Sequence, residues 1–433
     1  MISFDTTSFV KTIVALGLAL AVMLVWGQQR RLLPVLNANQ RTTRWLAFVA
    51  LRLVPFAIIY LVLDQEPRSD VDFFYRKAIP AMQGKMVYRD FLSFHAPLFS
   101  YLIALPLFIW NNARVLVLLM ALVEFIIANA TYRCMRPSTP NAAPSDALLR
   151  FVIYYLLPLP FVAMVLSSEE DIWMWGFGLL TLALPTSLSD RRFAFLTGLV
   201  WAVGMLTVKF MLIVLLIPLF FLIRERLYYL LGLLVVGIPA LLILFGLMGT
   251  DFLMPIQHSS YPMAPNMISV LRPILGSLFG QISLTSLNWV GLLGTIGGGS
   301  WVAWRFRNLG YRRAFPLVFC FVFGLFMVLL PSAPGYYLFT QEMALVFVVL
   351  ANTRTSWFQF SLLNFLLVVQ PILMIVYANN VLYTNLPMLT NPIYALDYFI
   401  QVVELVLLVG LVVLTYKKLN VVTANQLPQL PRT

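Results

Sequence analysis

The chain has 433 residues, of which 61% are hydrophobic and 11% are charged, whereas an ordinary soluble domain has roughly 25% charged residues. Together with a mean hydropathy of +0.89, this composition excludes a soluble enzyme, a disordered regulator and a fibrous protein. It predicts an all-α polytopic membrane protein. The net charge of +12 is also typical of nucleic-acid-binding proteins, so the basic residues must first be placed relative to the membrane.

A helix needs about 20 apolar residues to cross the ~30 Å hydrocarbon core of a bilayer. Thirteen stretches are apolar enough, and we predict thirteen transmembrane helices within a single domain that takes up residues 1–433. The predicted spans are residues 9–27, 45–63, 114–132, 149–166, 172–187, 193–208, 210–223, 227–248, 287–304, 315–331, 337–351, 357–377 and 398–416.

Lysine and arginine orient these spans, because they accumulate in cytoplasmic loops. If Arg30 and Arg31 are cytoplasmic, alternation places nineteen of the 29 basic residues on that side and eight on the other. The predicted topology therefore has an outer N-terminus and a cytoplasmic C-terminus. It explains the charge without a nucleic-acid partner.

Two long segments remain on the outer side, residues 64–112 and 249–286. The first contains an apolar stretch at 97–110 that is too short to span, so we predict amphipathic helices at the membrane interface there. The second has four prolines and is expected to be a structured loop. Residues 421–433 are polar and should form a flexible tail.

Acidic residues are scarce, seventeen in all, so their clustering is informative. Asp70 and Asp72 follow the second predicted span, and residues 169–171 (Glu-Glu-Asp) follow the fourth. Three consecutive carboxylates at a membrane boundary need water, a cation or basic groups beside them. The alternatives are a solvated helix start for the first cluster and interfacial solvation for the second. Because both clusters face the same side, we expect one shared site.

Lys209 interrupts an apolar run from Phe193 to Ile223, and a lysine within the bilayer is costly. Two short spans on either side would bring it to the outer interface, where it is expected to have a phosphate or carboxylate partner. Snorkelling towards water is the alternative. Inside the predicted spans, Glu124 and Glu404 are possible partners of Arg52.

Several motifs resemble those of the GT-C-type membrane glycosyltransferases. Residues 84–91 (GKMVYRDF), followed by 95–98 (HAPL), resemble the first outer loop of this family. Residues 169–171 match its second outer acid, 206–209 (LTVK) resemble its Thr-Lys motif, and 334–337 (PGYY) resemble a late aromatic–proline motif. The family includes protein mannosyltransferases and the lipid A aminoarabinose transferase.

The resemblance implies transfer of a sugar at the outer, periplasmic face of a bacterial inner membrane. The donor would be a polyprenyl-phosphate sugar, the acceptor a hydroxyl of a glycan, lipid or protein, and the anomeric configuration would invert. The implied roles are general base for Asp70 or Asp72, donor-phosphate binding for Lys209 and Arg272, and acceptor binding for Glu169, Glu170 and Asp171. Glu170 and Asp171 are also implied ligands of a divalent cation, Mg²⁺ or Mn²⁺. Further candidates are Tyr88, Asp90, His95, His258, Tyr337 and Glu342.

Two other interpretations stay open. A lipid flippase or transporter would favour internal repeats and a site at the midplane, whereas the sequence has no repeat and its acids lie towards one face. A polysaccharide polymerase or ligase would favour arginine-rich outer loops, but Arg272 is the single arginine of the second large loop.

Overall fold

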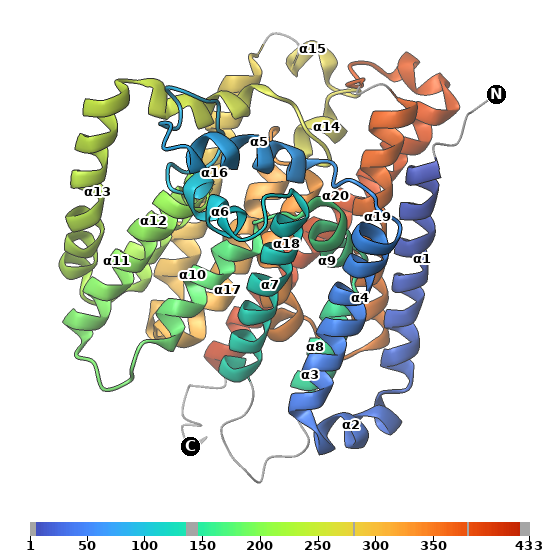
Figure 1. Cartoon of the computed structure of the whole chain (residues 1–433), viewed down its shortest axis with the longest axis horizontal. Coiled ribbons are helices and arrows are strands. Elements are labelled where there is room, and N and C mark those ends of the chain that lie inside the picture. The colour runs from blue at the N-terminus through green and yellow to red at the C-terminus, as the bar shows by residue number, and fades with distance from the viewer. Residues whose placement is uncertain (1–5, 136–145, 280–281, 379–380, 425–433) are drawn as a thin grey trace, which may run out of the picture.

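The computed structural model describes residues 6–135, 146–279, 282–378 and 381–424, apart from the side chains of 6, 7, 257–260 and 277. The described chain is a bundle of helices that run between an upper and a lower end in Figure 1, and it contains no β-strand. The prediction of an all-α protein is therefore confirmed for this part of the chain. The shorter helices α5, α6, α14 and α15 lie across the upper end (Figure 1).

The α-helices are α1 (Thr6–Gly27), α2 (Gln29–Ala38), α3 (Gln40–Phe48), α4 (Val54–Phe56), α5 (Asp70–Met82), α6 (Phe99–Ala104), α7 (Arg114–Met135), α8 (Ala147–Leu156), α9 (Pro158–Phe161), α10 (Ile172–Ala183), α11 (Asp190–Thr207), α12 (Ile213–Leu222), α13 (Arg226–Met248), α14 (Met267–Leu271), α15 (Gly276–Phe279), α16 (Leu284–Arg305), α17 (Tyr311–Leu329), α18 (Phe339–Ala344), α19 (Arg354–Ile372) and α20 (Pro392–Ala424). The 3₁₀ and π segments are η1 (Val49–Leu53), η2 (Ala57–Val62), η3 (Leu105–Phe108), η4 (Val162–Ser167), η5 (Phe210–Leu212), η6 (Asp251–Ser260), η7 (Arg307–Leu309), η8 (Gly335–Leu338), η9 (Leu345–Val349), η10 (Leu373–Tyr377) and η11 (Leu386–Thr390).

Each predicted span overlaps a helix or a run of consecutive helices. Seven helices in the described chain are long and apolar enough to cross a membrane, and an eighth is added if the bent pair Ala147–Leu156 and Pro158–Ser167 counts as one span. Other predicted spans, such as those at α10 and α12, correspond to shorter apolar helices. A multi-pass membrane protein is thus supported, but the count of thirteen spans is not confirmed. The seven are Ser8–Gly27, Gln40–Val62, Arg114–Met135, Arg226–Met248, Tyr311–Leu329, Arg354–Tyr377 and Pro392–Ala424.

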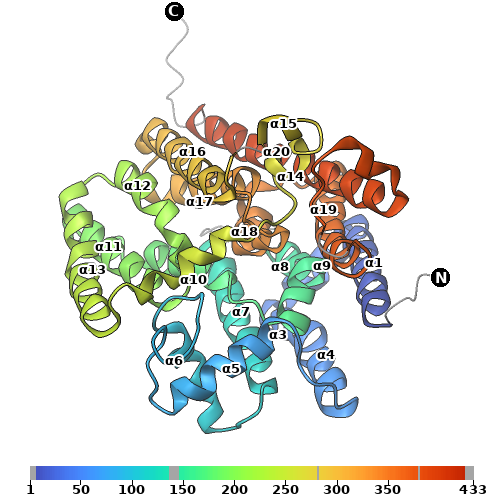
Figure 2. The ribbon, with the colours of Figure 1, turned by 90° about the horizontal axis from the view of Figure 1, so that it is seen from above.

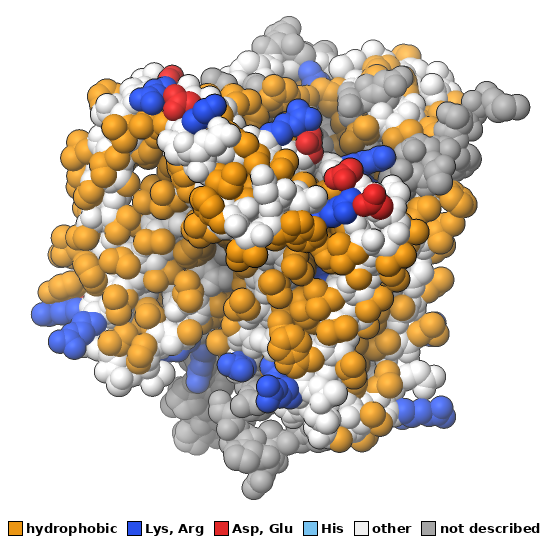
Figure 3. All heavy atoms as spheres, viewed as in Figure 1, with side chains coloured by type: hydrophobic (Ala, Val, Ile, Leu, Met, Phe, Trp, Pro, Cys, Tyr) orange, Lys and Arg blue, Asp and Glu red, His pale blue; other side chains and the backbone are white. Residues whose placement is uncertain are grey.

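The helices differ in how much of their surface the protein covers. Of the apolar window in α17, 78% is buried inside the bundle, against 11% for α13. Figure 2 shows the same arrangement from above, with α17 inside and α13 at the edge. A broad apolar band covers the face in Figure 3, and Lys and Arg side chains gather at its lower edge. Such a band is what a lipid bilayer contacts.

Pro158 causes a bend between α8 and α9. Leu157 has an extended ψ of 137° between α8 and α9, because the residue before a proline disfavours the helical conformation. The two halves meet at 60°, and the second half ends at Ser168, which is left-handed (φ 57°, ψ 46°). This left-handed residue ends η4 and starts the acidic segment 169–171.

The first outer segment forms the short helices α5 and α6. α5 buries Val71, Phe74 and Ala78, the one-sided spacing of an amphipathic helix.

The predicted flexible tail is wrong for residues 421–424, because α20 continues to Ala424. Adding a residue to an existing helix costs less than starting a new one, so the helix extends into this segment. Residues 425–433 of the predicted tail lie outside the described residues.

Inside the bundle, Arg52 pairs with Glu124 through two contacts, Nε–Oε2 at 2.7 Å and Nη2–Oε1 at 2.8 Å. Both side chains are fully buried. Tyr154 Oη donates to the same carboxylate at 3.0 Å, and Arg52 donates to the Tyr155 carbonyl at 3.2 Å. This pair ties η1 to α7 and α8, so it sets the spacing of the helices that lead to the two acidic clusters. Glu404, the other carboxylate considered for Arg52, is not its partner.

Removing one member of the Arg52–Glu124 pair should destabilise the protein far more than removing both. Arg52→Met leaves Glu124 buried without its cation and should lower the free energy of unfolding by about 3–5 kcal/mol. The double variant Arg52→Met/Glu124→Met should recover most of this loss, because no buried charge remains. Denaturant titration in detergent measures both. Arg224→Met, which breaks an exposed pair with Asp190, is the control and should change little; equal losses in Arg52→Met and the control would contradict the expectation.

Candidate functional site

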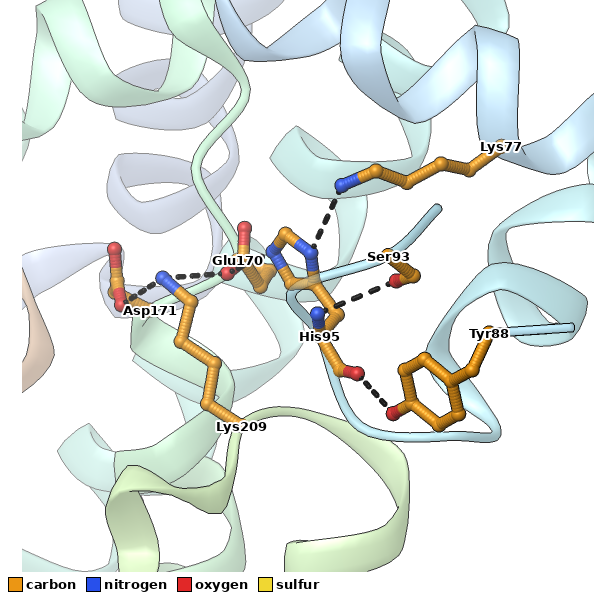
Figure 4. A network of polar contacts seen from close by, with 7 residues as sticks. All are labelled: Lys77, Tyr88, Ser93, His95, Glu170, Asp171 and Lys209. Carbon is orange, nitrogen blue, oxygen red and sulfur yellow. Dashed lines mark hydrogen bonds and ion pairs between the residues drawn. The ribbon is translucent and has the colours of Figure 1, made fainter. Parts of the chain in front are cut away.

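Lys209 lies between two carboxylates from the acidic segment (Figure 4). Its Nζ is 2.7 Å from Glu170 Oε1 and 2.8 Å from Asp171 Oδ1. Both carboxylates are fully buried, and the Lys209 side chain is 13% exposed. The Nζ also lies 4.9 Å from the ring centroid of Tyr337, a cation–π distance. Lys209 therefore has the anionic partner expected from the sequence, and that partner is the protein itself.

His95 continues this chain of contacts from the other side. Its Nε2 is 2.9 Å from Glu170 Oε1, and its Nδ1 is 3.2 Å from Lys77 Nζ. An ammonium can only donate and an ionised carboxylate can only accept. The network therefore assigns a neutral imidazole whose Nε2–H donates to Glu170 and whose Nδ1 accepts from Lys77.

Backbone hydrogen bonds hold His95 beside Lys209. The amide of Ala96 donates to the Val208 carbonyl at 3.1 Å, and the amide of Leu98 donates to the Leu206 carbonyl at 2.9 Å. These bonds join the first outer loop to the end of α11, over a hundred residues later. Tyr88 Oη donates to the His95 carbonyl from within the loop, and the His95 ring stacks on Phe99 with centroids 4.4 Å apart.

Asp70 and Glu169 lie together beside this cluster. After burial, the Asp70 carboxyl is the largest cause of the raised pKa of Glu169, so the two carboxyl groups are immediate neighbours. Each follows a residue with positive φ, Ser69 at 62° and Ser168 at 57°. Such conformations are uncommon for residues other than glycine and are concentrated at functional sites. Asp70 of the first predicted cluster and residues 169–171 of the second therefore lie together.

Burial and neighbouring charges separate the protonation of the three acids. Burial, followed by the Asp70 carboxyl, raises the pKa of Glu169 well above its usual range. For Glu170, burial acts in the same direction, but Lys209 and His95 outweigh it and hold the pKa low. Burial raises the pKa of Asp171 to about 7, against the opposing effect of Lys209. Of the three, Glu169 therefore holds a proton most readily and Glu170 least, with Asp171 between them.

The two cations differ in how far they are already neutralised. Carboxylates hold the pKa of Lys209 well above its usual value despite burial. Burial lowers the pKa of Lys77, and no carboxylate of the described chain forms an ion pair with it at 4.0 Å or less. Lys77 lies seven residues after Asp70, on the same face of α5. Sequence reasoning missed it, although this spacing was a signal that could have found it.

The cation ligands implied by the family resemblance gain no support. Glu170 Oε2 and Asp171 Oδ2 are buried and have no partner among the described residues. However, the other oxygens of both groups bind the Lys209 ammonium, and the described chain has no set of three or more His, Cys, Asp or Glu side chains arranged for a metal. A second positive charge beside Lys209 would be opposed by Coulomb repulsion.

Several candidates lie elsewhere or serve the loop. Asp72 pairs with Arg76 on the exposed side of α5, with its side chain 47% exposed. Asp90 accepts from the Met86 amide at 2.7 Å and pairs with Arg89, so it shapes the turn. Glu342 is buried in the bundle near Glu124 and Arg52, away from the acids of the loops.

Two further candidates come from the second large loop. Arg272 lines a cavity to which neither Lys209 nor its partners contribute. His258 lies in η6, but its side chain is outside the described residues.

Helix geometry explains why Asp72 does not join Asp70. Two residues along a helix turn a side chain by about 200°, so Asp70 and Asp72 cannot face the same site.

Comparison with protein-family models and with curated proteins found no match for this chain. The role of the cluster therefore has to be inferred from its geometry and chemistry.

If Lys209 holds the two buried carboxylates, removing it should destabilise the protein. We expect Lys209→Met to lower the free energy of unfolding by about 3–5 kcal/mol, and Lys209→Met/Glu170→Gln to recover part of that loss. Lys85→Met, at an exposed lysine of the first outer loop, is the control. Unfolding in detergent measures all three. A snorkelling lysine would instead give a small loss with no rescue.

Proposed function

We propose that this protein is a membrane glycosyltransferase that moves a sugar from a polyprenyl-phosphate donor to an acceptor hydroxyl, with inversion. The observation that carries the proposal is the convergence of Asp70 and Glu169 beside the buried chain Lys77–His95–Glu170–Lys209. A base and cations thus lie together at one end of an apolar helical body, where a lipid-borne substrate would present its head group.

Asp70 is the proposed general base. In this proposal Glu169 holds a proton, because burial and the neighbouring Asp70 carboxyl raise its pKa, and donates a hydrogen bond to the Asp70 carboxylate. The acceptor O–H transfers its proton to Asp70 while the acceptor oxygen bonds to the anomeric carbon. The bond from that carbon to the phosphate oxygen breaks on the opposite face, and polyprenyl phosphate leaves as an anion. A positioned carboxylate contributes about 10²–10⁴-fold in such a step.

Lys77 is a better candidate than Lys209 for the donor phosphate. Lys209 already has two carboxylates within 2.8 Å, whereas Lys77 donates to the neutral ring of His95. A phosphate attracts the cation that is not yet neutralised. In this assignment, Lys209 keeps Glu170 in place, and Glu170 in turn orients His95 and Lys77.

The neighbouring surface supports access from the bilayer. η3 and the residues after it expose Leu105, Phe108 and Ile109, the last at 92%. Exposed apolar side chains on short helices at the end of the bundle are typical of segments that dip into the interface. The family resemblance of the first loop agrees with this location, and with an active site on the periplasmic side of a bacterial inner membrane.

Asp70 and Asp72 provide a matched pair of variants. Asp70→Asn keeps the shape of the side chain but cannot take up the acceptor proton, so turnover should fall by about 10²-fold or more while donor binding is retained. Asp72→Asn removes only an exposed contact to Arg76 and should leave turnover nearly unchanged. The measurement is release of free polyprenyl phosphate by purified protein supplied with polyprenyl-phosphate sugars.

Three results would contradict this proposal. Normal turnover in Asp70→Asn would show that Asp70 is not the general base. Loss of turnover in Asp72→Asn alone would assign the general base to Asp72, on the other face of α5. Movement of the donor across proteoliposome membranes without release of polyprenyl phosphate would indicate a flippase.

The titration of Asp171 predicts a pH dependence of donor binding. Because its pKa is raised to about 7, lowering the pH from 8 to 6 removes one negative charge from the cluster. The phosphodiester of the donor keeps its own charge over this range, so its affinity should rise a few-fold as the pH falls. In Asp171→Asn the affinity should no longer depend on pH in this window. An equal dependence in both proteins would assign the titration to another group.

A further inference from the structure

A cavity lies between the loop before α14, the start of α16 and the region where α20 begins. Its wall is mainly apolar and includes Met263, Ile268 and Leu382. Its polar lining includes Arg272 and Gln401. None of the acids or lysines of the Asp70–Lys209 cluster lines it.

Arg272 brings an unpaired positive charge to this cavity. It is half-buried at the end of α14, and no carboxylate of the described chain forms an ion pair with it. A guanidinium presents five donors in a fixed fork and matches the geometry of phosphate and carboxylate groups. An anionic ligand in the cavity could therefore pair with the Arg272 guanidinium, which no carboxylate of the described chain neutralises.

Gln401 brings an unused acceptor. Its side chain is 3% exposed, and its Oε1 has no hydrogen-bond partner among the described residues. Its amide nitrogen is engaged, because Nε2 donates to Asp397 Oδ2 at 2.7 Å. Tyr383 and Gln370 donate to the same carboxylate at 2.7 and 3.0 Å, so the amide of Gln401 is held in this orientation. A buried acceptor left without a donor is costly, and a ligand hydroxyl would satisfy it.

A chain of packing contacts connects the lining of the cavity to the Lys209 site. Met263 donates to the Pro331 carbonyl at 2.8 Å, and both residues line the cavity. A Cβ added to Gly335 would lie 2.9 Å from Pro265 Cδ, so the loop before α14 packs directly on the segment that carries Tyr336 and Tyr337. Tyr337 in turn contacts Lys209.

We propose that this cavity is a binding site for a ligand with an anionic phosphate or carboxylate group, held by Arg272, and a neighbouring hydroxyl, held by Gln401 Oε1. The apolar wall suits a lipid whose head group has this chemistry, and a free sugar or polyol phosphate shares the same two groups. The inference goes beyond the proposed function, because binding here requires no transfer reaction.

The experiment compares two probes on the purified, delipidated full chain. Phosphatidylglycerol, retained by the protein and counted by native mass spectrometry, represents the lipid, and glycerol 3-phosphate, titrated calorimetrically, represents the soluble ligand. We expect Arg272→Gln to weaken binding of the preferred probe by about tenfold and Gln401→Met to weaken it a few-fold. The control is Arg68→Gln, at an exposed arginine of the first outer loop, which should bind like the unaltered protein.

Each outcome decides the proposal. Arg272-dependent retention of phosphatidylglycerol supports a lipid ligand, and Arg272-dependent binding of glycerol 3-phosphate supports a soluble one. Binding of neither probe, or equal effects of Arg272→Gln and Arg68→Gln, would overturn the site. Because these readouts are binding measurements, loss of the proposed transferase activity would not affect them, and failure of this site would leave the test of Asp70 intact.

Discussion

The ammonium of Lys209 between two buried carboxylates is the interaction on which the rest of the cluster depends. Removing ions of this kind from water costs several kilocalories per mole each, and here the cost is offset only where α11, the acidic segment and the first outer loop meet. The pair therefore stabilises one arrangement of three segments distant in sequence. It also keeps Glu170 ionised, so that Glu170 can orient His95.

The bundle contains a second buried pair with a different consequence. Arg52 and Glu124 satisfy each other with two hydrogen bonds and lie entirely inside, so their role is to set helix spacing. In the cluster at the upper end, the oxygens of Glu170 and Asp171 are only partly used, and the Asp70 carboxyl lies beside that of the buried Glu169. Incompletely satisfied charge of this kind is more typical of sites that bind or react than of structural pairs.

Hydropathy alone predicted the all-α class and the positions of the long apolar helices, because a helix that contacts lipid must be apolar along its length. It could not establish the number of spans. α10 is only 12 residues long and is covered by neighbouring helices, so its length was not set by bilayer thickness. Likewise, polarity suggested a flexible tail from residue 421, although local helix propagation carries α20 to Ala424.

The sequence by itself determined which residues were costly enough to need a partner: the acids after two spans and a lysine inside an apolar run. Helical geometry was also sufficient to separate Asp70 from Asp72. Only the tertiary structure decided the partners, because Lys209 meets Glu170 across 39 residues and His95 meets Glu170 across 75. Lys77 was overlooked, and the separation of Arg272 from Lys209 was not foreseen, for the same reason: contacts between distant segments depend on how helices pack, and a single sequence does not encode them in any local pattern.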